Sequence, residues 1–136
     1  INFFDLGGRL MLADLPGYGF ARAAKTDIKR WTGLTRAYLR GRANLRRVCL
    51  LIDARVGLKE PDRAMMKMLD EAGQSYALVL TKTDALKAGA LAAARAAAVA
   101  EAARHTAAHP AVFVTSARKG RDIPALRAHL AALADG

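Results

Sequence analysis

The hydrophobic residues of this chain cluster in short runs separated by longer polar or amphipathic stretches. The runs at 48–52, 76–80 and 111–114 are only a few residues long and rich in branched side chains, which is typical of buried strands. Two further runs, 2–6 and 9–13, flank a pair of glycines that can supply the positive φ of a tight turn. This arrangement predicts an antiparallel hairpin at the start of the sequence.

The longer stretches predict helices. A helix over about 27–40 has an apolar face, which consists of Ile28, Trp31, Leu34, Tyr38 and Leu39. A second helix begins at Glu60-Pro61, because proline fits the first turn of a helix. Its inward-facing residues are predicted to be Met65, Met66, Met68 and Leu69. The alanine-rich segment 88–108 and the segment 123–133 predict two more helices.

Strands and helices alternate after the hairpin, and this alternation predicts a parallel sheet with right-handed helical connections. With 136 residues the chain is long enough for one domain with a core and too short for two ordinary ones. We therefore expect an α/β protein in which residues 1–136 form one domain.

The composition of 53% hydrophobic and 25% charged residues indicates a globular protein. No apolar run approaches the length needed to span a bilayer, and the residues after Ile1 lack the basic region of a signal peptide. The single cysteine, Cys49, is interpreted as a small core residue and suits a reducing compartment. We expect a cytoplasmic protein with no membrane partner, and a sequence that starts in the middle of a longer chain.

The net charge of +10 and the pI near 10.5 favour polyanionic partners, although an arginine-rich composition can also reflect a GC-rich genome. Ten basic residues lie between positions 22 and 55, against only Asp27 and Asp53. A solvated helix face is the usual explanation of a charge run, but such a face normally mixes both signs. We predict an RNA-facing surface that consists of Lys25, Lys29, Arg30, Arg36, Arg40 and Arg42.

The run 76–80 leads into Thr81-Lys82-Thr83-Asp84, at the end of a strand where open α/β sheets bind ligands. The carboxylate of Asp84 can accept two parallel hydrogen bonds from a flat pair of N–H donors. Guanine offers such a pair and adenine does not. Lys82 can lay its methylene stem along the face of a base. The simpler alternative is a strand end followed by an aspartate helix cap.

Two other polar segments follow predicted strands. In Asp14-Leu15-Pro16-Gly17, the aspartate is suited to hold a hydrated cation, and the glycine lets its N–H approach an anion closely. A tight turn in which the aspartate bonds its own backbone is the alternative. Thr115-Ser116-Ala117 follows the run 111–114. In a parallel sheet the three segments share one carboxyl edge, which predicts one ligand site there.

In this order the three segments resemble the later motifs of the Ras-like, translation-factor class of GTPases. The chain is most similar to the EngB/YsxC/YihA family of ribosome-assembly GTPases. The residues that carry this resemblance are Ile1-Asn2-Phe3-Phe4, Asp14-Leu15-Pro16-Gly17-Tyr18-Gly19, Asp53-Ala54-Arg55, Leu58, Asp62 and Met66. The resemblance covers essentially all of the chain. It implies a three-layer P-loop NTPase fold whose sheet is mostly parallel, with an antiparallel hairpin at its N-terminal end.

The resemblance also implies GTP or GDP as ligand and Mg²⁺ as its cation. Asp14 would hold Mg²⁺ through water, and Gly17, in the loop with Leu15 and Pro16, would donate to the γ-phosphate. Thr81, Lys82, Thr83 and Asp84 would read guanine, and the N–H of Ala117, after Thr115 and Ser116, would meet the guanine carbonyl. The implied function is a GTP/GDP switch that binds the large ribosomal subunit precursor, is linked to cell division and septation, and is a monomer when complete.

No G-x-x-x-x-G-K-[ST] phosphate loop occurs anywhere in the sequence. In the family this loop precedes a segment like residues 1–4, and its strand lies between those ending at Asp14 and Asp53. We therefore expect a fragment without the central phosphate-loop strand and the first helix, not competent for GTP hydrolysis by itself. No catalytic residue is assigned.

Two alternatives to the GTPase stay open. The first is a non-catalytic basic RNA- or ribosome-binding α/β module with a degenerate nucleotide site, which the missing phosphate loop favours. The second is another doubly wound nucleotide binder, although no dinucleotide glycine fingerprint is present.

Overall fold

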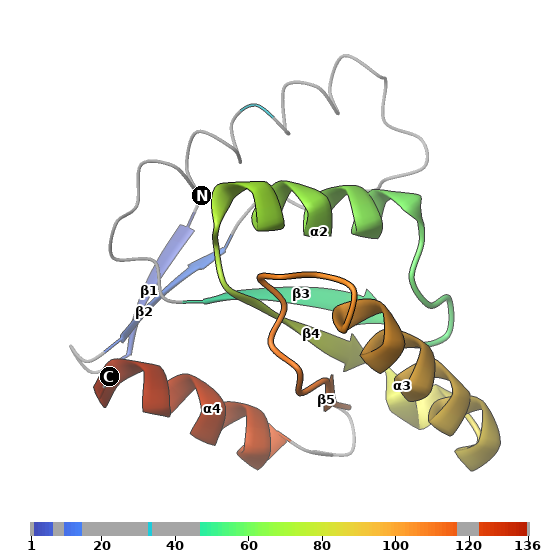
Figure 1. Ribbon diagram of the computed structural model, residues 1–136. Helices are drawn as coiled ribbons and strands as arrows, with labels where there is room; N and C mark the ends of the chain where they lie inside the picture. Colours follow the sequence, from blue (N-terminus) through green and yellow to red (C-terminus); the bar gives the residue numbers. More distant parts are fainter. Residues whose placement is uncertain (1, 7–9, 15–32, 34–46, 117–122, 136) are drawn as a thin grey trace.

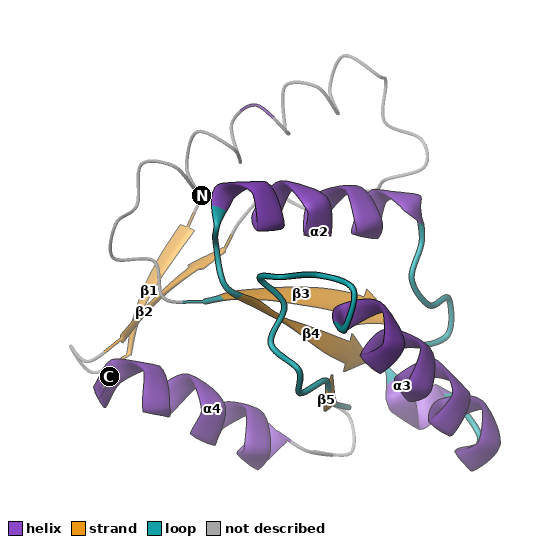
Figure 2. Ribbon diagram, viewed as in Figure 1, coloured by secondary structure: helices purple, strands orange, loops and turns teal. Residues whose placement is uncertain are grey.

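The computed structural model describes residues 2–6, 10–14, 33, 47–116 and 123–135 (Figures 1 and 2). The strands are β1 (Asn2–Leu6), β2 (Leu10–Asp14), β3 (Val48–Asp53), β4 (Tyr76–Thr81) and β5 (Phe113–Val114). The helices are α2 (Glu60–Ala72), α3 (Ala88–Ala102), α4 (Ile123–Asp135) and a short 3₁₀ turn, η1 (Thr83–Ala85). The alternation of elements predicted from the sequence is confirmed over these residues. The basic helix predicted over 27–40 lies outside the described residues, apart from Gly33.

The described strands form two sheets. β1 and β2 pair antiparallel, with Phe4 opposite Leu12, and this confirms the predicted hairpin. β3, β4 and β5 form a parallel sheet with β4 in the centre. Its register places Asp53 beside Thr81 and Leu80 beside Val114. Because all three strands are parallel, their carboxyl ends and the loops that follow lie at the same edge.

Helices cover the parallel sheet on both faces. α2 and α3 share one apolar core with alternate residues of the strands. This core contains Leu50, Ile52, Met65, Met66, Met68, Leu69, Tyr76, Leu78, Leu80, Ala98, Ala102, Val112 and Val114. On the opposite face the ring of His129 in α4 lies 4.8 Å from the ring of Phe113, and Figure 1 shows α2 and α4 on opposite sides of the sheet. The structure therefore has three layers, as predicted.

The face of the sheet that carries α4 is covered unevenly. Leu51 of β3 and Val79 of β4 are register partners and point to the same side. Val79 is 1% exposed, whereas Leu51 is 61% exposed. Cys49, on the same face of β3, is only partly buried, so the prediction that it is a core residue is wrong. Burial still raises the pKa of its thiol, an effect that the nearby Arg47 opposes.

α2 begins and ends where local interactions dictate. The carboxylate of Asp62 accepts a hydrogen bond from the N–H of Lys59 at 2.8 Å, and proline occupies the first turn. At the other end Gly73 has φ 66° and its N–H donates to the carbonyl of Asp70 at 3.0 Å. This left-handed residue satisfies a helix-end carbonyl, and a side chain there would be strained. The four buried residues of α2 are those predicted from the sequence.

α3 ends at Ala102, earlier than the predicted end near residue 108. The residues beyond it form hydrogen bonds that compete with continuation of the helix. The N–H of Ala107 donates to Asp70 Oδ1 at 3.0 Å, and its carbonyl accepts from the N–H of Tyr76 at 3.1 Å. His105 Nδ1 contacts Asp70 Oδ2 at 2.5 Å. The segment after α3 is therefore an irregular loop that is bonded to the start of β4.

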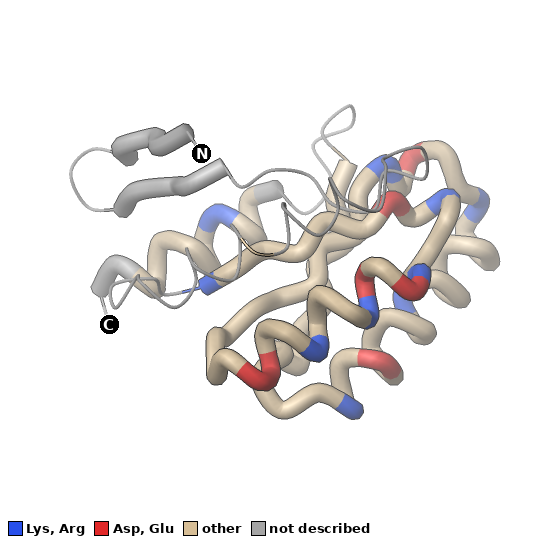
Figure 3. Tube along the Cα trace, turned by 90° about the horizontal axis from the view of Figure 1, so that it is seen from above, with Lys and Arg blue, Asp and Glu red and all other residues tan. Residues whose placement is uncertain are grey.

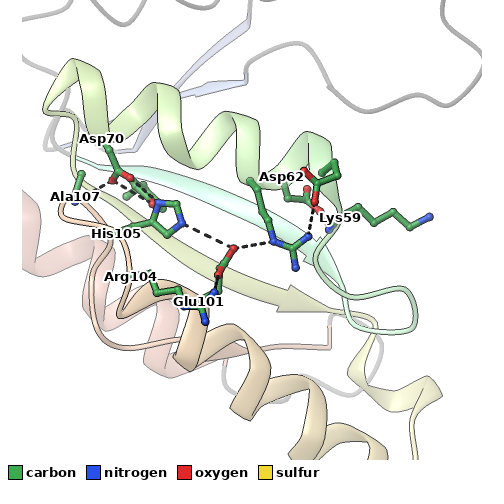
Figure 4. Close-up of polar contacts among 10 residues, drawn as sticks. Lys59, Asp62, Asp70, Glu101, Arg104, His105 and Ala107 are labelled. Carbon is green, nitrogen blue, oxygen red and sulfur yellow. Dashed lines mark hydrogen bonds and ion pairs between the residues drawn. The ribbon is translucent and has the colours of Figure 1, made fainter.

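The same segment belongs to a chain of polar contacts between α2 and α3 (Figure 4). Arg63 Nε donates to Glu101 Oε1 at 2.8 Å, and Arg63 Nη1 donates to Glu60 Oε1 at 3.1 Å. Glu101 Oε1 also lies 3.9 Å from His105 Nε2. These contacts join α3 to α2 beside the core.

β5 is shorter than predicted, since only Phe113 and Val114 of the run 111–114 are paired. The N–H of Ala111 donates to His109 Nδ1 at 3.0 Å, so it does not join the ladder. Tyr76 forms an isolated bridge with Ala108 instead. α4 begins at the predicted residue and ends at Asp135, two residues beyond the prediction.

Candidate functional site at the carboxyl edge of the sheet

The ends of β4 and β5 are joined by the hydroxyl and amide groups of two threonines. The N–H and the hydroxyl of Thr115 both donate to the carbonyl of Leu80, at 2.8 and 2.9 Å. The N–H and the hydroxyl of Thr83 both approach the carbonyl of Thr115, at 3.4 and 2.9 Å. Both threonines are buried, so these bonds are made away from water. These hydrogen bonds hold the loop after β4 against the loop after β5.

Lys82 turns the chain between Thr81 and Thr83. Its backbone has φ 56° and ψ 34°, and it is the one residue other than glycine with positive φ in the described part of the chain. This left-handed conformation is costly for a residue with a side chain and is often found at functional sites. The turn places Thr83 inside the protein while the side chain of Lys82 stays 62% exposed.

Asp84 and Ser116 meet across the two loops. The hydroxyl of Ser116 donates to Asp84 Oδ1 at 2.7 Å. Ser116 is fully buried, whereas Asp84 is partly exposed at the edge. A carboxylate fixed in this way can present acceptor positions to a planar donor pair. The structure therefore brings together six of the predicted ligand residues, which are Thr81, Lys82, Thr83, Asp84, Thr115 and Ser116.

The end of β3 adds an ion pair that sequence reasoning did not assign to the site. Arg55 donates from Nε to Asp53 Oδ1 at 3.1 Å and from Nη2 to Asp53 Oδ2 at 2.7 Å. Lys82 Nζ lies 3.6 Å from the same Oδ2. The hydrogen bonds from Arg55 are the main reason that the pKa of Asp53 falls from 3.8 to about 2. The motif Asp53-Ala54-Arg55 was visible in the sequence, but its contact with Lys82 depends on the pairing of β3 with β4.

The other predicted site residues are not brought to this edge by the described part of the structure. Asp14 is the last residue of β2, which pairs only with β1 among the described strands. Leu15, Pro16, Gly17 and Ala117 lie outside the described residues, as does the predicted RNA-binding set of Lys25, Lys29, Arg30, Arg36, Arg40 and Arg42. Residues 47–116 contain no group of three or more His, Cys, Asp or Glu side chains that could hold a metal ion.

Charge on the described surface is mixed. Figure 3 shows positions of Lys or Arg and positions of Asp or Glu interspersed along the described part of the trace. The positive excess of the whole chain is therefore concentrated in segments that the structure does not describe. No described helix has the length and apolarity needed to cross a membrane.

The fold is similar to that of the translation elongation factor SelB from Methanococcus maripaludis. The apo form of SelB matches with a TM-score of 0.67 at 17% identity, over 76% of this chain and 23% of SelB. Its complex with the GTP analogue GppNHp matches with a TM-score of 0.62 at 18% identity, over the same shares of the two chains. The chain therefore has the P-loop GTPase fold of the Ras-like class, as predicted from the sequence.

Sequence comparison identifies the family. A probable GTP-binding protein EngB from Rhodospirillum rubrum is 59% identical to this chain, covering 98% of it and 60% of the relative. The EngB proteins of Granulibacter bethesdensis and Gluconobacter oxydans are 53% and 48% identical over 99% and 98% of this chain. This chain belongs to the EngB family. It spans about 60% of the length of the curated relatives it matches. No protein-family model matches the chain.

The ion pair between Asp53 and Arg55 predicts how the pKa of Asp53 changes when Arg55 is replaced. Replacement of Arg55 by Ala removes the hydrogen bonds that lower the pKa of Asp53, so this pKa should rise from about 2 toward 3.8. Because the folded pKa is the lower one, the ion pair stabilises the protein above pH 3.8 and loses this effect as the pH falls toward 2. A ¹³C titration of the Asp53 carboxyl measures the change.

Arg63→Ala provides the control, because Arg63 pairs with Glu60 and Glu101 and not with Asp53. An Asp53 pKa that stays near 2 in the Arg55→Ala variant would contradict the role given to Arg55.

Proposed function

We propose that this chain is part of a GTP-binding protein that acts as a GTP/GDP switch in assembly of the large ribosomal subunit in the cytoplasm, with a link to cell division. The observation that carries the proposal is the placement of Asp84. Its carboxylate is held by Ser116 at the edge of the sheet, next to Lys82 and beside the buried contacts of Thr83 with Thr115. Membership of the EngB family supports guanine nucleotide as the ligand.

In this proposal Asp84 accepts hydrogen bonds from the ring N–H and the exocyclic amine of guanine. Lys82 supplies an apolar stem to one face of the base, and the backbone after Ser116, at Ala117, meets the guanine carbonyl. Thr81 and Thr83 hold the loop through backbone contacts. Thr81 Oγ1 donates to the carbonyl of Ile52 at 3.3 Å. Among these groups, the side chains of Thr81, Thr83 and Asp84 have hydrogen-bond partners in the structure without a ligand, which supports a preformed base site.

The phosphate end of the site is proposed from sequence. Asp14 would hold Mg²⁺ through water, and Leu15, Pro16 and Gly17 would lie near the γ-phosphate. An aspartate oxygen suits Mg²⁺, which keeps several of its waters in proteins. The nucleotide state would then be passed through this loop to the basic set Lys25, Lys29, Arg30, Arg36, Arg40 and Arg42, which would contact ribosomal RNA.

We also propose that residues 1–136 are the larger part of a GTP-binding domain whose phosphate loop lies in a preceding segment. Two observations support this. Among the described strands, β3 is an edge strand of the parallel sheet and does not pair with β2. The exposed Leu51 beside the buried Val79 fits a sheet face that another segment would cover. The complete protein would hydrolyse GTP and be a monomer, whereas residues 1–136 alone would not hydrolyse GTP.

A second candidate function is a basic RNA- or ribosome-binding module whose nucleotide site no longer works. The absence of a phosphate-loop motif from all 136 residues and the net charge of +10 favour it. The two functions predict different sequences upstream of Ile1 in the gene. A Walker-type motif there supports the switch, and its absence supports the binding module.

The proposed role of Asp84 predicts a change of base preference. In the complete protein, Asp84→Asn should lower affinity for GDP by about 2–5 kcal/mol, because the base would no longer meet a charged acceptor. The amide can donate to the carbonyl that xanthine has in place of the amine, so the affinity for xanthosine diphosphate should rise. Equilibrium titration with fluorescent nucleotides measures both affinities. Glu71→Gln, on an exposed position of α2, is the control, and unchanged GDP affinity in Asp84→Asn would remove Asp84 from this role.

The proposed cover over β3 predicts an unequal response to charge at two exposed residues. Leu51 and Val56 are 61% and 54% exposed in this chain. In the complete protein, Leu51→Lys should destabilise by about 2 kcal/mol or more because its side chain would be buried there. Val56→Lys, in the loop after β3, should change stability by less than about 0.5 kcal/mol. Urea unfolding measures both, and a neutral Leu51→Lys would contradict the proposed cover.

The proposed RNA-binding surface predicts a specific salt dependence. Binding of the complete protein to large ribosomal subunits should weaken as salt rises. Replacement of Lys29 or Arg36 by Ala should reduce the log–log slope by about one for each phosphate that the side chain neutralises. Lys67→Ala, on the exposed side of α2, should leave the slope unchanged. Equal slopes in all variants would show that these residues do not contact RNA.

A further inference from the structure

Lys82 is held at both ends in this structure. Its backbone is fixed in the left-handed region at φ 56° by the hydrogen bonds of its neighbours. The carbonyl of Thr81 accepts from the N–H of Ala54 at 3.0 Å, and Thr83 is bonded to Thr115. At the other end, the ammonium lies 3.6 Å from Asp53 Oδ2. These two ends restrict the directions that the four-carbon stem can take, while the side chain stays 62% exposed.

Asp53 is well suited to hold an ammonium. Its register partner is Thr81, the residue before Lys82, so the pairing of β3 with β4 sets the distance between the two side chains. Arg55 fixes the carboxylate with two side-chain hydrogen bonds and one from its backbone N–H at 3.0 Å. Asp53 stays ionised far below neutral pH, because these bonds favour its charged form. The carboxylate is thus a rigid, charged partner at a defined place.

We propose that Asp53 is a positioning residue of the nucleotide site, because it anchors the ammonium of Lys82 so that the methylene stem forms a flat apolar surface for the purine. The inference rests on the function proposed above. A free lysine side chain samples many rotamers, and part of this conformational entropy would be lost each time the stem is ordered against a base. An anchor present before binding removes part of this cost. The residue acts through Lys82 and does not itself touch the base.

The position of Asp53 also explains why loss of its contact with Lys82 should affect binding of the base. The pKa of the Arg55 guanidinium is raised mainly by its hydrogen bonds and charge interaction with Asp53, and in addition by the nearby charge of Asp84. Asp53, Arg55, Lys82 and Asp84 therefore lie along one stretch of the edge. A shift of the Lys82 stem would change the surface beside the acceptor proposed for guanine, while leaving the phosphate end untouched.

The test is a double-mutant cycle in the complete protein. The measured quantity is the dissociation constant of a fluorescent GDP, in the wild type and in the Asp53→Asn, Lys82→Ala and doubly substituted proteins. Asp53→Asn should weaken binding by about two- to fivefold, the range of a partly exposed ion pair. It should have no further effect once Lys82 is alanine. Asp53→Glu, which keeps the carboxylate, should retain affinity within about twofold.

A second measurement uses the wild type alone, so it remains informative if Asp53→Asn does not fold. The NMR order parameter of the Lys82 ε-carbon should exceed that of Lys67, an exposed lysine on α2. An equal order parameter, no loss of affinity in Asp53→Asn, or the same loss in the Lys82→Ala background would each overturn the inference. A wild-type protein that does not prefer GDP over ADP would instead refute the proposed function, and the order parameter would still test the anchor.

Discussion

The burial of β4 between two parallel neighbours is the constraint on which the rest of this structure depends. Its residues from Tyr76 to Leu80 are at most 1% exposed, so each N–H and C=O must be paired by a neighbouring strand or loop. β3 satisfies one edge. β5 satisfies the other, together with Ala107 and His109 of the preceding loop, which form hydrogen bonds with Tyr76. At the carboxyl end, where β5 stops, the hydroxyl and N–H of Thr115 take over this role at Leu80.

This constraint also fixes the loops that form the proposed site at the end of the strand. Because Thr115 is tied to β4 and Thr83 is tied to Thr115, the loops after both strands have fixed positions. Asp84 and Ser116 can then meet at 2.7 Å, although they are 32 positions apart in the sequence. A polar site on a rigid edge needs little reorganisation when a ligand binds, which is what selective recognition of a planar base requires.

Much of this could be predicted from the sequence, and the failures have physical causes. The apolar runs predicted the places of all five described strands, although β5 is shorter than its run, and Met65, Met66, Met68 and Leu69 were correctly predicted as the buried face of α2, because periodicity reflects burial directly. The predicted end of α3 was wrong, because the helix propensity of alanine cannot reveal that Asp70 accepts a hydrogen bond from the N–H of Ala107. This contact joins segments that are distant in the sequence. The Asp53–Lys82 contact was missed for the same reason, since it exists only through the register of β3 and β4.

The central claim is that the loops after β4 and β5 form a guanine site. Amide chemical shifts of the complete protein, recorded while GDP or ADP is added, test it most directly. The account predicts that GDP shifts the amides of residues 81–85 and 115–117 and that ADP at the same concentration does not. Shifts that avoid these two loops, or equal shifts with both nucleotides, would contradict it.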